Sequence, residues 1–287
     1  MKASSRRRLL LAVAVAVPLM ATTSWTWPDT DQTASTGADT QAVYGGLPKA
    51  RPFTLRSWTR ILENRGFTVG YSELRRNPLW VVYHVRPIQR RKSYRRPKDF
   101  QVDSRTLVRV SQRDYLNSGY QRGHLAPSWL IAQLHGREAQ RQTFLMSNIT
   151  PQKPRLNQKL WQRLEEVEAD HFARWFNGVW VITGPVFDDH IQHLRSGVEV
   201  PDAFYRIYLD EADASGRPKA LAFLVPQTVR GDEPLGRFKT TVDDIETRTG
   251  LDFLPALEDG LEASLEASLA DDRDWRLSEV CCLPPRY

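Results

Sequence analysis

A segment in the middle of the chain combines residue types that suit phosphate chemistry. Arg122 and His124 flank Gly123 within residues 119–127. On an extended segment residues i and i+2 point to the same side, so the guanidinium and the imidazole can face one phosphate. A planar guanidinium fits a phosphate, and a neutral histidine can take a proton at physiological pH. We therefore interpret this segment as the centre of a phosphodiester-cutting site with His124 as the base. A packed structural histidine is the alternative.

Two metal-compatible side chains follow on a helix predicted over about residues 156–175. An apolar stripe marks the side that faces the core: Leu156, Leu160, Leu164 and Val167. Asn157 and Glu165 lie on the flank next to this stripe, about 12 Å apart along the helix axis. Because both cannot easily bind one ion directly, one would ligate the metal and the other a metal-bound water, which suits Mg²⁺. An ordinary polar helix flank is the alternative.

Positive charge is concentrated before the proposed base. The chain has 287 residues and a formal net charge of +6. Residues 86–98 hold seven basic residues and no acidic one: Arg86, Arg90, Arg91, Lys92, Arg95, Arg96 and Lys98. Such a run attracts polyanions, so we predict a groove for nucleic acid, with a solvated loop as the alternative. Cys281 and Cys282 are adjacent, which does not provide the spaced ligands of a zinc site.

The N-terminus has the composition of a targeting segment. Four basic residues, Lys2 and Arg6 to Arg8, precede an apolar run over residues 9–21, and no acidic residue occurs before Asp29. We predict that residues 1–24 are a signal peptide or an uncleaved membrane anchor, that 25–43 are a linker and that 44–287 fold. This predicts a secreted or periplasmic protein, with a mitochondrial presequence as the less favoured alternative.

Other patterns predict the framework around these residues. Strands are expected over residues 78–85, 178–187, 198–209 and 220–226, with the second of them central in a sheet. Helices are expected over 241–249, ending at Gly250, and over 257–270. Asp188, Asp189, His190 and His193 offer a second metal site, against the alternative of ordinary loop side chains.

Taken together, these blocks resemble the DNA/RNA non-specific endonuclease family of ββα-metal nucleases, over about residues 46–253. The matching blocks include residues 78–85, Phe100 with Asp103, 119–127, 147–152, Asn157 with Trp161 and Glu165, 181–187 and 244–250. The resemblance implies an α+β fold, with a central, mainly antiparallel sheet flanked by helices. It also implies a strand-to-helix metal finger over residues 119–165.

The resemblance also implies residue roles. His124 would activate the attacking water, Asn157 would bind one Mg²⁺ directly, with Mn²⁺ as a substitute, and Glu165 would hold the water cluster of the metal. Arg122 and Arg96 would stabilise the transition state, and cleavage would leave 5′-phosphate ends. Substrate contacts are expected from Arg95 of the basic run and from Gln121, Asn148 and Gln152 of the matching blocks.

Two positions depart from the family pattern. Gln121 stands where the family has Asp, and Ala169 stands where some members carry an arginine one helical turn after the glutamate. The expected function is a Mg²⁺-dependent endonuclease acting on DNA and RNA, with membrane anchoring and a homodimer as expected associations. The alternatives are a phosphodiesterase acting on nucleotides and a non-catalytic DNA-binding or DNA-uptake protein with a degenerate site.

Overall fold

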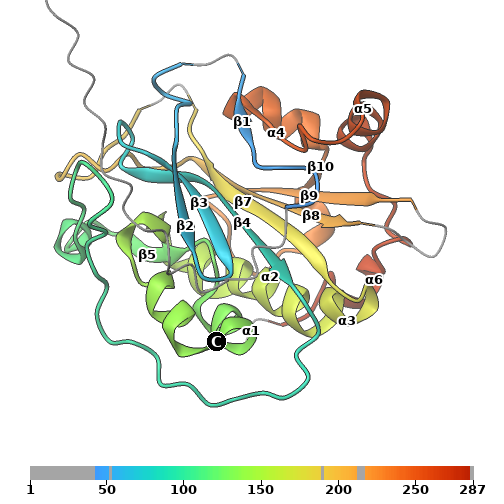
Figure 1. Cartoon of the computed structure of the whole chain (residues 1–287), viewed down its shortest axis with the longest axis horizontal. Coiled ribbons are helices and arrows are strands. Elements are labelled where there is room, and N and C mark those ends of the chain that lie inside the picture. The colour runs from blue at the N-terminus through green and yellow to red at the C-terminus, as the bar shows by residue number, and fades with distance from the viewer. Residues whose placement is uncertain (1–42, 52–53, 189–190, 212–216, 285–287) are drawn as a thin grey trace, which may run out of the picture. The chain divides into compact units, whose positions relative to one another are not determined.

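A single antiparallel sheet forms the centre of the fold. The computed structural model describes residues 43–51, 54–188, 191–211 and 217–284. Seven strands pair in the order β10-β9-β8-β7-β4-β3-β2 (Figure 1). Their bounds are β2 (Arg60–Asn64), β3 (Phe67–Ser72), β4 (Asn77–Val85), β7 (Val179–Val186), β8 (Ala203–Asp210), β9 (Lys219–Pro226) and β10 (Lys239–Thr240). The predicted α+β class with a central antiparallel sheet is confirmed.

The middle strands are apolar because both faces of the sheet are covered. Every residue of β7 and β8 is buried, and successive residues such as Val81 and Val82 of β4 enter two different cores. The strands predicted over 78–85, 178–187 and 220–226 are therefore confirmed. The strand predicted from residue 198 begins only at Ala203, and Pro201, which has no N–H for a ladder, lies just before it.

Helices cover one face of the sheet beside the finger (Figure 1). They are α1 (Ser128–Thr143), which the sequence patterns did not indicate, and a continuous helical stretch of four parts. The parts are the π-helical η3 (Leu156–Trp161), α2 (Gln162–Val167), the π-helical η4 (Glu168–Phe172) and α3 (Ala173–Trp175). The predicted stripe is confirmed, since Leu156, Leu160, Leu164 and Val167 are all fully buried. The π-helical turns were not expected from a regular helical period.

Two further helices cover the other face. They are α4 (Val242–Thr249) and α5 (Asp259–Ala267), close to the residues predicted. Thr241 caps α4 by accepting a hydrogen bond from the backbone N–H of Asp244, and Gly250 ends it in the left-handed region with φ 67°. The remaining elements are short: β1 (Lys49–Ala50), η1 (Gln112–Tyr115), η2 (Met146–Asn148), η5 (Leu235–Phe238), β11 (Leu251–Asp252) and α6 (Leu277–Val280).

A two-stranded ribbon carries the central motif. β5 (Gln121–His124) pairs antiparallel with β6 (Ile149–Gln152), with Arg122 opposite Pro151 and His124 opposite Ile149. The chain then enters η3, so the predicted strand-to-helix finger is present, with α1 inserted between its two strands. The predicted signal or anchor over residues 1–24 and nearly all of the predicted linker lie outside the described residues. Among the helices that are described, none combines the length and apolar character needed to cross a membrane.

Candidate active site

A cleft of about 580 Å³ opens between the finger and the basic loop of residues 86–98. Its walls come from β5, the start of α1, η3, α2 and η4, together with Arg96 from the loop. Five of the predicted site residues line it: Arg96, Arg122, His124, Asn157 and Glu165. Segments separated by more than sixty positions in the sequence therefore meet at one site, as the resemblance implied.

His124 is a buried, neutral histidine. Its side chain packs edge-on against Phe144, with ring centroids 4.9 Å apart, and its Nε2 has no hydrogen-bond partner among the described residues. Burial, and then the positive charge of Arg96, lowers the pKa of His124 to about 3. The imidazole at the wall of the cleft is therefore in its free base form, with a buried nitrogen that has no partner among the described residues.

Two aromatic rings support the arginines. The guanidinium carbon of Arg122 lies 5.0 Å from the ring centroid of Phe100, and that of Arg96 lies 5.1 Å from the ring centroid of Phe144. Arg122 also donates a 3.5 Å hydrogen bond to the carbonyl oxygen of Gln112. Because these rings are not anions, both guanidinium groups keep their charge available for a phosphate.

The two candidate metal-binding side chains are held differently. Nδ2 of Asn157 donates a 2.7 Å hydrogen bond to Oε1 of Gln121, which fixes the amide of Asn157. Glu165 receives no hydrogen bond from the described residues. Burial raises the pKa of Glu165 to about 8, although the charge of Arg206 acts in the opposite direction. A half-buried carboxyl group with so few polar partners is poised to exchange its proton for a cation.

These donors fit a hard divalent cation. Asn157 offers an amide oxygen, Glu165 offers a carboxylate, and no sulfur or second imidazole joins them in the lining of the cleft. Oxygen donors of this kind suit Mg²⁺ or Mn²⁺, and the open cleft has room for the waters that Mg²⁺ retains. The arrangement therefore fits a metal with one direct protein ligand and a second side chain that acts through water.

Four predicted residues do not line the cleft. Gln121 is half-buried beside it and contacts the cleft only through its hydrogen bond with Asn157. Asn148 is fully buried, and its side chain bonds to the backbone of Ala126 and Thr143. Gln152 is also fully buried, and its Oε1 lies only 2.0 Å from where a Cβ on Gly123 would be. Gly123 is thus needed for packing of the two finger strands. Arg95 is exposed on the basic loop, outside the cleft.

The structure adds contacts that no sequence pattern indicated. Nε1 of the buried Trp161 donates a 3.2 Å hydrogen bond to the carbonyl oxygen of His124, which links the helix to the finger. The indole of Trp129 is partly exposed, lines the cleft, and has the guanidinium of Arg91 5.4 Å from its ring centroid. Arg91 in turn pairs with Asp170 near the end of the cleft. A tryptophan two residues after the 119–127 motif was the available signal for this ring in the lining of the cleft.

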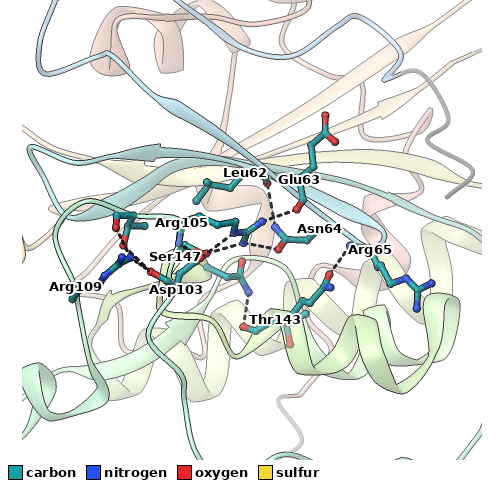
Figure 2. Close-up of polar contacts among 12 residues, drawn as sticks. Leu62, Glu63, Asn64, Arg65, Asp103, Arg105, Arg109, Thr143 and Ser147 are labelled. Atoms are coloured by element: carbon teal, nitrogen blue, oxygen red, sulfur yellow. Dashed lines mark hydrogen bonds and ion pairs between the residues drawn. The ribbon is translucent and has the colours of Figure 1, made fainter. Parts of the chain in front are cut away.

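Hydrogen bonds of Asp103 anchor the segment that follows the basic loop in the sequence. Oδ2 of Asp103 accepts hydrogen bonds from Ser147 at 2.6 Å and from Arg105 at 2.7 Å (Figure 2). Arg105 continues to the side chain of Asn64 at the end of β2. Burial favours a raised pKa for Asp103, but the hydrogen bonds from Arg105 and Ser147 outweigh it and lower the pKa. Asp103 therefore ties the loop to both the sheet and the segment before β6.

A buried ion pair lies beneath the cleft. Nη1 of Arg206, on β8, is 3.3 Å from Oε2 of Glu168, and both side chains are fully buried. Tyr83 donates a 2.8 Å hydrogen bond to Oε1 of Glu168. The guanidinium carbon of Arg206 also lies 4.2 Å from the ring centroid of Trp161. Arg206 lies on β8, whereas the arginine that some family members carry at the position of Ala169 would lie on η4.

The alternative metal site after β7 has only two of its four residues in the described chain. Asp188 forms two 2.7 Å hydrogen bonds with Nη2 of Arg248, so its carboxylate is already paired. Asp189 and His190 lie outside the described residues. Cys281 and Cys282 are both free thiols.

Comparisons with known proteins identify what the chain is similar to. The sequence model of the DNA/RNA non-specific endonuclease family matches residues 50–260. Mitochondrial endonuclease G of Homo sapiens is 30% identical over 218 residues, which cover 71% of this chain and 72% of that protein. Mitochondrial nuclease EXOG of Danio rerio is 30% identical over 249 residues, covering 79% of this chain and 69% of that protein.

Two further matches extend the comparison. The nuclease of Serratia marcescens is 34% identical over 151 residues, or 51% of this chain and 55% of that protein. The crystal structure of an EndoG/EndoGI complex contains a chain with the same fold, with a TM-score of 0.67 and 24% identity. That match covers 79% of this chain and 95% of the other.

The predicted location is corrected by these relatives. A secreted or periplasmic protein was expected, but the matched nucleases of Danio rerio, Xenopus laevis and Homo sapiens are mitochondrial. A basic, acid-free, partly apolar N-terminus is shared by export and import signals, which explains why composition favoured the wrong compartment. The membrane anchor is likewise unsupported, and the predicted homodimer stays a prediction.

Proposed function

The chain belongs to the DNA/RNA non-specific endonuclease family and is a nucleic-acid-hydrolysing enzyme, and we propose that it cuts both DNA and RNA internally with one Mg²⁺ ion, leaving 5′-phosphate ends. Members of this family depend on a metal ion. The observation that carries the proposal is the meeting of His124, Arg122, Arg96, Asn157 and Glu165 in one cleft.

In this proposal His124 is the general base. Its neutral imidazole accepts a proton at Nε2 from the attacking water, because His124 lines the cleft and this nitrogen has no hydrogen-bond partner among the described residues. Phe144 fixes the ring from the side, and the Trp161 indole fixes the backbone of His124 from below. A base held in this way loses little freedom when the substrate binds.

The cation would be held by Asn157 and Glu165. Asn157 supplies the direct oxygen ligand, oriented by its hydrogen bond to Gln121, and Glu165 holds metal-bound water once its carboxyl group is ionised. When bound, Mg²⁺ supplies charge neutralisation at the scissile phosphate and the leaving oxygen. Mn²⁺ has the same preference for oxygen ligands and substitutes for it.

The arginines contact the phosphate. Arg122 from β5 and Arg96 from the basic loop both line the cleft, so their guanidinium groups stabilise charge that develops on the phosphate oxygens. Arg95 and the rest of the basic loop follow the flanking phosphates, and Trp129 offers a face on which a base can stack. Such contacts read the backbone and not the base edges, which accounts for action on any sequence. Asn148 and Gln152 support the finger in place of their predicted substrate contact.

The test uses the full-length protein with supercoiled plasmid and with RNA, each in Mg²⁺ or EDTA. We expect Mg²⁺-dependent cutting of both substrates, and ligation of the products without prior phosphorylation. His124→Ala should lose at least about 100-fold in rate while DNA binding is kept. His193→Ala, at a histidine outside the cleft, is the matched control. If the unmodified protein and His124→Ala bind DNA alike and neither cuts, the non-catalytic DNA-binding alternative takes the place of the nuclease.

A further inference from the structure

A group of acidic side chains lies on the face of the sheet opposite the cleft. α4 and α5 pack side by side there, over the core that contains Val82, Val242 and Ile245 (Figure 1). Asp243 and Glu246 of α4 and Glu266 of α5 each offer a carboxylate oxygen, and these oxygens all lie within 4.8 Å of one another. The core against α1 and α2 is separate, so this cluster is not part of the proposed nuclease site.

Glu266 is the member that requires an explanation. Its residue is only 6% exposed, and its Oε1 has no hydrogen-bond partner among the described residues. It points toward Asp243 and Glu246, which are acceptors and cannot satisfy an ionised carboxylate. Leaving an ionised carboxylate buried and unpaired is costly, so such a group either keeps a proton or is paired with a cation.

The described residues around the cluster lack enough positive charge to pair with it. Asp252 and Glu262 add two more carboxylates, whose charges also act on Glu266. Arg51 pairs with Asp252 at 3.1 Å, and Lys49 acts on Glu262. Burial, followed by the negative charges of Glu246 and Glu262, raises the pKa of Glu266 to about 8. Two basic side chains near five carboxylates leave a local excess of negative charge.

We propose that Asp243, Glu246 and Glu266 bind a Ca²⁺ ion that ties α4 to α5. Two oxygen ligands on one Ca²⁺ ion lie at most about 5 Å apart, because each Ca–O bond is about 2.3–2.6 Å long, and the cluster meets this limit. Ca²⁺ takes six to eight oxygen ligands in flexible geometry, whereas Mg²⁺ is seldom held by an all-protein carboxylate site. Asp243 is exposed, so water can complete the coordination.

The ion would have a structural role. Glu246 already accepts a 2.6 Å hydrogen bond from the backbone N–H of Phe253, so the site is anchored to the segment that joins the two helices. α5 buries few of its residues, Glu266 being its one fully buried member. A cation between Glu266 and the two α4 carboxylates would fasten this weakly packed helix to the sheet. Nuclease activity in Mg²⁺ should not depend on it.

The test titrates Ca²⁺ into the EDTA-treated, dialysed full-length protein by calorimetry and follows thermal unfolding. Asn157→Ala lacks the proposed metal ligand in the cleft, and we expect this variant to keep one Ca²⁺ site. Glu266→Gln should lose the Ca²⁺ site between α4 and α5. At a Ca²⁺ concentration about 100-fold above Kd, Tm should rise by about 5–10 °C in the unmodified protein. Glu279→Gln, at an exposed carboxylate on α6, is the matched control and should keep the full shift.

Other outcomes have definite meanings. If Glu266→Gln misfolds, Asp243→Asn at the exposed ligand replaces it and should weaken Ca²⁺ binding at least tenfold. Equal Ca²⁺ binding by Glu266→Gln and the unmodified protein would overturn the proposal. So would binding that disappears in Asn157→Ala, because the ion would then be in the cleft. Binding of Mg²⁺ in preference to Ca²⁺ would overturn the choice of ion. Loss of plasmid cutting in His124→Ala is a separate observation that bears only on the proposed nuclease function.

Discussion

The side-chain amide of Asn157 donates a 2.7 Å hydrogen bond to Oε1 of Gln121. Gln121 stands on β5 of the finger and Asn157 on η3, so this contact crosses from the strand to the helix. With its nitrogen engaged, the amide can turn only its oxygen toward a cation. The glutamine at the position where the family has Asp thus keeps one function of a carboxylate, the orientation of the ligand, without its charge.

Replacing Gln121 separates the effect of orienting Asn157 from the effect of a negative charge. Gln121→Asp should keep an acceptor for Asn157 and add a negative charge, so we expect the Mg²⁺ concentration for half-maximal cleavage to fall about tenfold. Gln121→Leu removes the acceptor and should raise that concentration about 10–100-fold. Gln158→Asp, at the cleft-lining residue that follows Asn157, is the charge control. If it lowers the Mg²⁺ requirement as much as Gln121→Asp does, charge alone and not orientation explains the effect.

Metal binding should depend on pH through Glu165. Its raised pKa of about 8 means that the carboxyl group carries a proton at lower pH, and the cation must displace it. The half-saturating Mg²⁺ concentration should therefore fall as pH rises from 6 to 8, by up to about tenfold per pH unit. Glu165→Gln should bind Mg²⁺ more weakly and without this dependence, whereas Glu138→Gln on α1 should behave as the unmodified protein. A flat response in the unmodified protein would show that Glu165 is ionised before the metal arrives.

The parts of the site that follow a local period could be predicted from the sequence. Arg122 and His124 share a side because they are two apart on a strand, and Asn157 and Glu165 share a flank because they border an apolar helical stripe. The π-helical turns on both sides of α2 did not disturb this flank. Strands β4, β7 and β9 were evident because a doubly covered sheet requires continuous apolar runs.

The parts that depend on tertiary contact could not be predicted. A buried amide such as Asn148 looks the same in sequence whether it faces a substrate or, as here, the backbone of Ala126 and Thr143. The ion pair of Glu168 and Arg206 was only weakly indicated by the sequence pattern. Glu168 follows Leu164 at the spacing of the apolar stripe, and Arg206 interrupts the apolar strand β8. Only the fold shows that these two exceptions meet.

The cleavage rate should persist to a lower pH than is usual for an enzyme with a histidine base. Because burial and Arg96 hold the pKa of His124 at about 3, its imidazole stays neutral well below its ordinary pKa of about 6.5. At saturating Mg²⁺ the cleavage rate should therefore be kept from pH 7 down to about pH 5. Imidazole NMR signals of His124, assigned by comparison with His124→Ala, should show no titration in that range. A midpoint near pH 6.5 in either measurement would contradict the neutral buried state.

Glu168 and Arg206 should show a large coupling energy in stability, because each is costly to leave buried without the other. Glu168→Leu would leave the buried guanidinium of Arg206 without its carboxylate, and we expect unfolding free energy to drop by about 3–5 kcal/mol in urea titrations. Arg206→Met should cost a similar amount, because it leaves Glu168 unpaired. The double variant should lose much less than the sum of the two, since apolar side chains of similar size can replace a buried pair.

The effects of these variants on the cleavage rate should not follow their effects on stability. Arg206 packs on Trp161, whose indole donates to the carbonyl oxygen of His124. Arg206→Met and the double variant should therefore both cut DNA more slowly even where stability is restored, with kcat reduced and DNA binding kept. Trp161→Phe, which removes only the donor N–H, is the matched variant and should reproduce the loss in kcat. If the double variant regains both stability and full kcat, the buried arginine supports the fold alone and the position of His124 is set by Phe144 and β6.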